Sequence, residues 1–175
     1  GPVVAADGDS TGRLAVLYQH TGVFYVDYFD GVSWLNLSLE GVVTSPVYDI
    51  ALAPGRIGII AAASLVVDPN PTIQTIWTVF EWSGANWVSA HSGSVNNRNA
   101  NGKAHLCYSQ GNGRLSVAIT DHPQPPDQTP PSWDLDIWHE KSDGQLANYK
   151  AYTALLNYDV DLDLVRNNTD TLVTY

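Results

Sequence analysis

Cysteine, methionine and basic residues are scarce in this chain of 175 residues: it has one cysteine, no methionine and only 8 lysines and arginines. The single thiol, Cys107, excludes an internal disulfide, and its apolar neighbours predict an inert core position. The formal net charge of −10 argues against nucleic acid and anionic membrane surfaces as partners. The longest apolar run, Ile57 to Val67, falls well short of the ~20 residues that span a bilayer.

Residues that favour strands and turns are abundant instead. Gly, Pro, Val, Thr, Tyr and Trp are prominent, and 44% of the residues are hydrophobic, which suffices for one packed all-β domain over residues 1–175. Asn36-Leu37-Ser38 and Asn167-Asn168-Thr169 match the N-glycosylation sequon. They favour a secreted or extracellular location.

A short motif recurs along the chain. Gly12-Arg13-Leu14, Gly55-Arg56-Ile57 and Gly113-Arg114-Leu115 each open an apolar strand, and their arginines stand 43 and 58 residues apart. Such self-similarity is the signature of a repeat protein. Because the arginines begin equivalent strands, we expect them to hydrogen-bond carbonyl groups of the scaffold instead of a ligand.

Each motif lies within a series of four predicted strands. A strand precedes the motif, and an aromatic strand and a fourth strand follow it, joined by turns at Asp30-Gly31, Ser83-Gly84 and Asp143-Gly144. Four short strands per 40–58 residues are typical of β-propeller blades. A β-sandwich is the competing all-β interpretation, but it does not explain the repeated motif.

The repeats predict about three and a half blades. Their approximate bounds are residues 2–43, 44–100 and 101–154, with a half blade over 155–175, where strands are expected at Tyr158 to Val165 and Thr171 to Tyr175. Propellers close a ring of 4–8 blades to avoid exposed edges. We therefore expect a partial ring that is completed by a second copy or by a remainder of the chain.

Long connections indicate where a ligand would bind. In a propeller, the connections from second to third strand and from one blade to the next share one face. Here the segments Val66 to Gln74, Gly93 to Gly102 and Asp121 to Ser132 are long on that face, and scaffolds carry binding residues on loops. The predicted ligand-binding residues are Asn97, Arg98, Asn99, Asp121, His122 and Asp127.

Carboxylates in the predicted innermost strands indicate a second kind of site. Asp49 and Asp159 follow tyrosines in matching Tyr-Asp segments, so both are placed near the mouth of the central channel. Crowded carboxylates bind cations through their oxygens. Asp49 and Asp159 are therefore predicted to be metal ligands, for Ca²⁺. The alternative is that they belong to a polar strand face that is exposed to solvent. No other cofactor is expected.

The first repeat resembles the fungal fucose-binding lectin family. The shared elements are an apolar strand ending Tyr18-Gln19, an aromatic strand, and a closing Asp-Gly-x-x-Trp over residues 30–34, and Trp87 repeats that closing tryptophan. The resemblance implies a propeller that holds sugar between blades with an Arg, a Glu and aromatic residues. Alignment places Ala15 at that arginine and Val26 near that glutamate, so the family's polar ligands are not conserved here.

The sequence thus predicts a non-catalytic, lectin-like domain that binds carbohydrate on the long-loop face. Two alternatives stay open. One is a glycan-active hydrolase or lyase that uses Asp49 and Asp159, although no complete catalytic motif occurs. The other is a scaffold for protein interactions.

Overall fold

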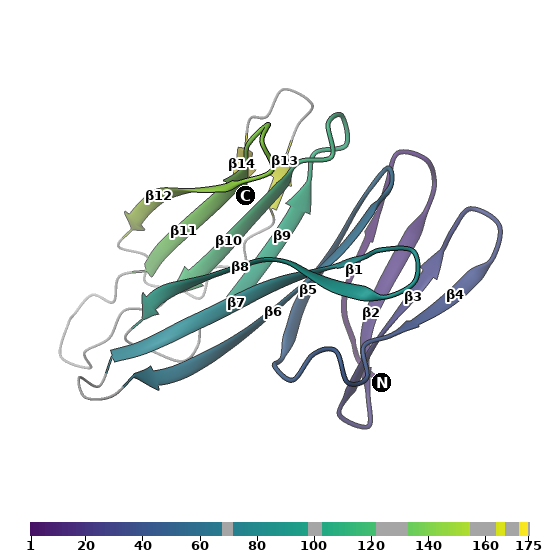
Figure 1. Ribbon diagram of the computed structural model, residues 1–175, viewed down its shortest axis with the longest axis horizontal. Helices are drawn as coiled ribbons and strands as arrows, with labels where there is room; N and C mark the ends of the chain where they lie inside the picture. Colours follow the sequence, from purple (N-terminus) through teal and green to yellow (C-terminus); the bar gives the residue numbers. More distant parts are fainter. Residues whose placement is uncertain (68–71, 98–102, 122–132, 155–163, 167–171, 175) are drawn as a thin grey trace.

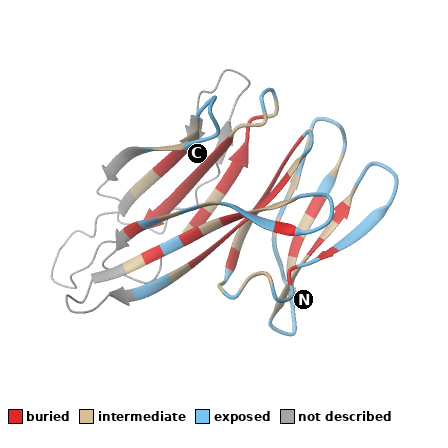
Figure 2. Ribbon diagram, in the orientation of Figure 1, coloured by how far each residue is buried: buried red, intermediate tan, exposed pale blue. Residues whose placement is uncertain are grey.

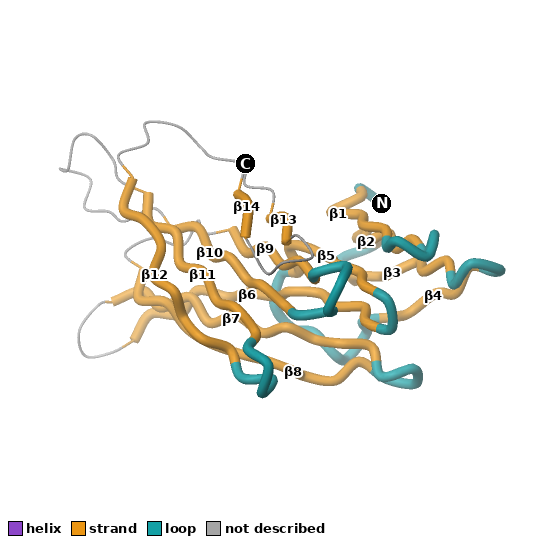
Figure 3. Tube along the Cα trace, turned by 90° about the horizontal axis from the view of Figure 1, so that it is seen from above, coloured by secondary structure: helices purple, strands orange, loops and turns teal. Residues whose placement is uncertain are grey.

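The computed structural model describes the chain except for residues 68–71, 98–102, 122–132, 155–163, 167–171 and 175. The described residues form strands and turns (Figure 3). Three antiparallel sheets of four strands follow one another along the chain, and a two-stranded sheet comes last. The prediction of an all-β chain built from repeated four-stranded units is confirmed.

The strands of each sheet are consecutive in the chain. Sheet 1 contains β1 (Val3–Gly8), β2 (Leu14–His20), β3 (Val23–Phe29) and β4 (Trp34–Ser38). Sheet 2 contains β5 (Val47–Ala53), β6 (Arg56–Val67), β7 (Thr72–Trp82) and β8 (Trp87–Asn97). Sheet 3 contains β9 (Lys103–Tyr108), β10 (Leu115–Asp121), β11 (Trp133–Glu140) and β12 (Leu146–Ala154). The two-stranded sheet pairs β13 (Leu164–Arg166) with β14 (Leu172–Thr174).

The sheets are arranged around their first strands. β5 lies against both β1 and β9, while the outer strands β4, β8 and β12 diverge (Figure 1). Tight turns close the hairpins as predicted, with the positive φ of 103° at Gly31 and 92° at Gly84 that such turns need. This arrangement is consistent with propeller blades, and the described sheets do not close a ring.

Apolar cores fill the spaces between successive sheets (Figure 2). Leu17 of sheet 1 and Ile59 of sheet 2 are fully buried in the first core. In the second core the rings of Trp77 and Trp138 meet at 4.9 Å between centroids, so these tryptophans pack the sheets together. Cys107 is buried, as its apolar neighbours predict.

Two of the repeated arginines bind backbone of the following sheet. Arg13 Nη2 donates to the Ala53 carbonyl oxygen at 3.1 Å, and Arg56 Nη1 donates to the Gly113 carbonyl oxygen at 2.6 Å. The predicted scaffold role is therefore confirmed for Arg13 and Arg56. In these two copies of the motif, the arginine joins one sheet to the next.

Aspartates of the inner strands make a second set of ties between sheets. Asp7 Oδ2 accepts the Leu52 amide at 2.7 Å, and Asp49 Oδ2 accepts the Leu106 amide at 3.1 Å. Each carboxylate thus satisfies a backbone donor of the next sheet, and a buried donor without a partner would be costly. The inner strands are joined by side chain-to-backbone bonds.

The strands of sheet 2 extend beyond their predicted ends. β6 continues to Val67, and β7 begins at Thr72, so most of the segment expected as a long connection is a hairpin extension. That prediction was wrong because polar side chains favour a loop in this segment, whereas its backbone groups pair along the ladder. In the last repeat, residues 158–163 of the expected strand lie outside the described residues.

In the part of the chain that the structure describes, no helix has the length and apolar character needed to cross a membrane.

Candidate functional site

A pocket opens at the end of sheet 1, between the β2–β3 turn and the connection from β4 to β5. Its volume is about 550 Å³. The connection from second to third strand and the connection to the next repeat were expected to share one face, and the pocket lies between connections of these two kinds. It lies, however, in the first repeat, where the β2–β3 connection is short. The lining residues are Gln19, Gly22, Val23, Phe24, Leu39, Glu40, Gly41, Val43, Thr44, Ser45 and Pro46.

Local backbone geometry explains why the pocket forms. Thr21 and Gly22 have φ of 48° and 83°, the pair of positive values of a two-residue type I′ turn, so one wall is short. The opposite wall is held at both ends. The Leu39 carbonyl oxygen accepts the Val42 amide at 3.1 Å, and the Pro46 carbonyl oxygen accepts the Ala62 amide of β6 at 3.1 Å.

The pocket combines an apolar floor with a polar rim. Phe24 and the buried Leu39 belong to the core between sheets 1 and 2 and reach the pocket from below. The side chains of Gln19, Glu40 and Thr44 make no hydrogen bond or ion pair with the described residues. An apolar surface bordered by a few unengaged polar groups is the usual composition of a small-molecule site.

Of the predicted ligand-binding residues, the structure describes Asn97 and Asp121, and neither lines this pocket. Asn97 ends β8 and Asp121 ends β10, so both lie at the equivalent ends of sheets 2 and 3. The predicted residues Arg98, Asn99, His122 and Asp127 lie outside the described residues. A site formed by these six residues stays a prediction.

Of the two predicted metal ligands, the structure describes only Asp49. Asp49 Oδ1 accepts the Ile50 amide at 2.8 Å, and its Oδ2 lies 3.6 Å from His105 Nδ1 besides accepting the Leu106 amide. Asp159 lies outside the described residues. The described residues contain no group of three or more side chains placed to hold a metal ion, so the cation site stays a prediction.

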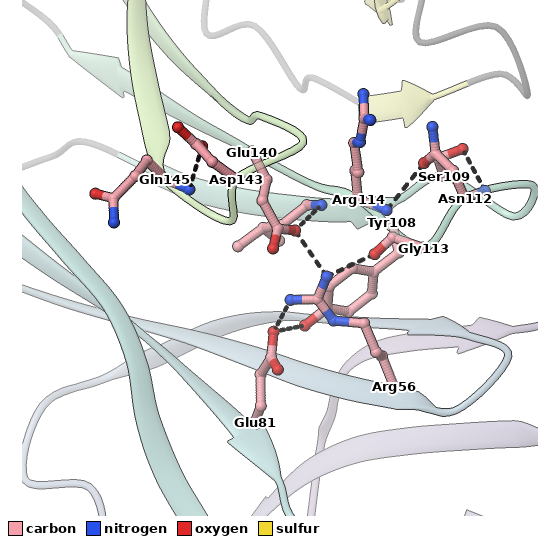
Figure 4. Close-up of polar contacts among 11 residues, drawn as sticks. Arg56, Glu81, Tyr108, Ser109, Asn112, Gly113, Arg114, Glu140, Asp143 and Gln145 are labelled. Atoms are coloured by element: carbon pink, nitrogen blue, oxygen red, sulfur yellow. Dashed lines mark hydrogen bonds and ion pairs between the residues drawn. The ribbon is translucent and has the colours of Figure 1, made fainter.

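A cluster of charged and polar side chains lies between sheets 2 and 3 (Figure 4). Arg56 Nη1 donates to Glu140 Oε2 at 2.7 Å, its Nη2 pairs with Glu81, and its guanidinium stacks 4.6 Å from the ring centroid of Tyr108. Tyr108 Oη donates to Glu81 Oε1 at 2.8 Å, and Glu140 Oε2 also accepts the Leu115 amide at 2.7 Å. Both terminal nitrogens of Arg56 and the hydroxyl group of Tyr108 thus have protein partners.

The pKa shifts of Arg56 and Tyr108 agree with a structural role for this cluster. Burial alone lowers the pKa of Arg56, but Tyr108 and the hydrogen bonds to Glu140 and Glu81 outweigh it and raise that pKa above its ordinary value. Burial and the charge of Glu81 raise the pKa of Tyr108 well above its ordinary value. Tyr108 is 3% exposed and stays a protonated donor, and the contacts of the cluster join sheet 2 to sheet 3.

Gln19, Phe24 and Glu40 were not among the predicted site residues. The only sequence signals near them are Gly22 and Gly41, whose positive φ of 83° and 73° reverses the chain on either side of the pocket. A glycine at a turn is common in any β protein. It does not indicate that two turns face each other across a cavity.

Comparison with known proteins adds no relative. No protein-family model matches the chain, and no curated protein matches it. The resemblance of the first repeat to fucose-binding lectins therefore stays a prediction, and the all-β architecture of repeated four-stranded antiparallel sheets is the level at which the chain is classified.

Proposed function

We propose that this chain is a non-catalytic binding domain that takes a neutral carbohydrate in the pocket at the end of sheet 1. The observation that carries the proposal is the set of unengaged polar side chains, Gln19, Glu40 and Thr44, around an apolar floor that includes Phe24. A sugar ring has apolar C–H faces that suit an aromatic surface, and hydroxyl groups at its rim that suit amides and carboxylates. The net charge of −10 favours a neutral sugar over an acidic one.

The proposal places this pocket on a scaffold of β-propeller blades. The radial order of sheets 1 to 3 around β1, β5 and β9 supports it, and β13 with β14 would be the inner pair of a fourth blade. Blades from a second copy or from additional chain would close such a ring. The scaffold fixes the pocket because its walls belong to sheet 1 and to the link into sheet 2.

Titration calorimetry with a panel of neutral mono- and oligosaccharides tests the function. We expect one class of neutral sugar to bind without being cleaved. Gln19→Ala is expected to weaken that binding about tenfold, because one amide that bonds the sugar is lost, at ~1.4 kcal/mol.

Gln145→Ala is the matched control. Gln145 is exposed in the β11–β12 turn of sheet 3, and this turn corresponds to the end of sheet 1 that lies away from the pocket. Its affinity should equal that of the wild type. Absence of binding by every sugar in the panel, or equal affinities of the Gln19→Ala and Gln145→Ala variants, would contradict the proposed site.

A further inference from the structure

The Asn36-Leu37-Ser38 sequon lies on β4, the outer strand of sheet 1, which Figure 2 shows mainly as exposed surface. Successive side chains of a strand point to opposite faces. Leu37 is 5% exposed and packs in the core between sheets 1 and 2, whereas Asn36 and Ser38 are both exposed. The acceptor amide and the hydroxyl group of the sequon are therefore presented together on the solvent side of the strand.

Exposure at this position is a property of the outer strands and does not depend on sheet 1 being the first of the series. Strand register aligns Asn36 of β4, Ser89 of β8 and Asn148 of β12 with the third residue after the motif arginine in their sheets. Ser89 and Asn148 are exposed, although sheets 2 and 3 each pack on a preceding sheet. A sheet packed in front of sheet 1 would therefore still leave this position accessible.

The contacts of Asn36 are compatible with a glycan in the folded sheet. Its Nδ2 atom donates to Asp27 Oδ1 at 2.7 Å and to Tyr18 Oη at 3.2 Å. A side-chain amide has two protons on nitrogen, and attachment of a sugar removes one of them. The modified nitrogen can keep the shorter bond to Asp27 and give up the longer one, and Tyr18 Oη still lies 3.4 Å from Asp27 Oδ1.

We propose that Asn36 is an N-glycosylation site. The modification requires the extracellular location that the sequence favours, and it is independent of any sugar in the pocket. In the reaction, Asn36 Nδ2 attacks the anomeric carbon of an oligosaccharide that a membrane transferase holds on a lipid diphosphate. A C–N bond forms, the C–O bond to the diphosphate breaks, the lipid diphosphate leaves, and one amide proton passes to a base of the transferase.

A glycan at Asn36 also covers the open edge of sheet 1. Among the described strands, β4 pairs only with β3, so the other edge of β4 is open to pairing with a further strand. N-linked glycans are bulky and solubilising. Attached to the middle residue of β4, the glycan hinders other chains from pairing with that edge.

Translation of the full chain behind a cleavable leader, in the presence of rough microsomes, tests the proposal. Chain that enters the lumen is protected from added protease and meets the transferase. Peptide-N-glycosidase in isotope-labelled water then releases the glycan and leaves a labelled aspartate in place of Asn36. Peptide mass spectrometry separates this position from Asn167 of the second sequon, which lies outside the described residues. We expect most of the protected chain to carry a glycan at Asn36.

Two variants separate the sequon from the other contacts of Asn36. Asn36→Gln removes the acceptor nitrogen from its position, and Ser38→Ala removes only the hydroxyl group that the sequon requires. Both variants should lose the glycan at position 36. Ser38→Ala keeps the Asn36 amide itself, so its loss of modification is not explained by a missing side-chain amide.

Asn148→Gln is the matched control. Asn148 is exposed at the equivalent position of β12 but is followed by Tyr149-Lys150, so it is not part of a sequon. This variant should leave the occupancy of Asn36 unchanged. Protected wild-type chain with an unmodified Asn36 overturns the proposal, and so does full occupancy of Asn36 in the Ser38→Ala variant.

Discussion

Arg56 makes more polar contacts at the interface between sheets 2 and 3 than any other single side chain described above. Its guanidinium meets Glu140, Glu81 and the Gly113 carbonyl oxygen, and it covers the ring of Tyr108. The planar fork of an arginine supplies these donors in fixed directions, which a lysine does not. One cation is thereby shared between two carboxylates from different strands.

Replacing Arg56 with alanine should lower the free energy of unfolding by about 2–3 kcal/mol, because Glu81 and Glu140 would face each other without a cation. The three side chains are 13–24% exposed, so solvent screening keeps the loss below that of a fully buried pair. Urea unfolding measures it. Arg56→Lys should recover part of the loss.

Lys141→Ala is the control for charge alone, since it removes the same charge from an exposed turn. Its effect should stay within about 0.5 kcal/mol. If Lys141→Ala and Arg56→Ala destabilise the protein equally, Arg56 acts through net charge and not through its contacts.

At the scale of elements, close approach of β6 to β9 requires a residue without a side chain. Gly58 lies on β6, and a Cβ built there meets the hydroxyl oxygen of Tyr108, with the ring carbon Cζ at 3.0 Å. The phenol of sheet 3 therefore lies directly on the backbone of sheet 2. This contact lets Tyr108 reach Glu81 beside Gly58 in the ladder.

Gly58→Ala is expected to destabilise the protein by about 1–3 kcal/mol through overpacking. The hydroxyl is the nearest obstacle, so Tyr108→Phe should relieve part of this strain. The double variant should be more stable than the sum of the two single changes predicts. A double-mutant cycle by urea unfolding measures the difference, and strict additivity would show that the methyl group is accommodated without touching Tyr108.

Much of this element-level organisation is predictable from the chain. The Gly-Arg motif at Arg13 and Arg56 identifies equivalent strands, and alternation around them identifies the hairpins. The length of β6 was not predictable, because a loop was expected from Val66 to Gln74, whereas Val66 pairs with Ile73 and Val67 with Thr72. The pocket was not predictable either, since it arises where a short turn faces the link from Leu39 to Pro46.

At the scale of the whole molecule, the order of the sheets cannot be predicted from the pattern of any one strand. Leu14, Val16 and Tyr18 of sheet 1 alternate in the same way as Ile57, Ile59 and Ala61 of sheet 2, although Leu14 is 47% exposed and Ile59 is fully buried.

The bonds from Asp7 to the Leu52 amide and from Asp49 to the Leu106 amide have a consequence for aggregation. A foreign strand that adds to a sheet must first find free amide and carbonyl groups along an edge. On the inner edges of sheets 2 and 3 these carboxylates already occupy such amides. Strand addition, with the fibrils to which it leads, is thereby directed away from the inner edges and toward the outer strands β4, β8 and β12.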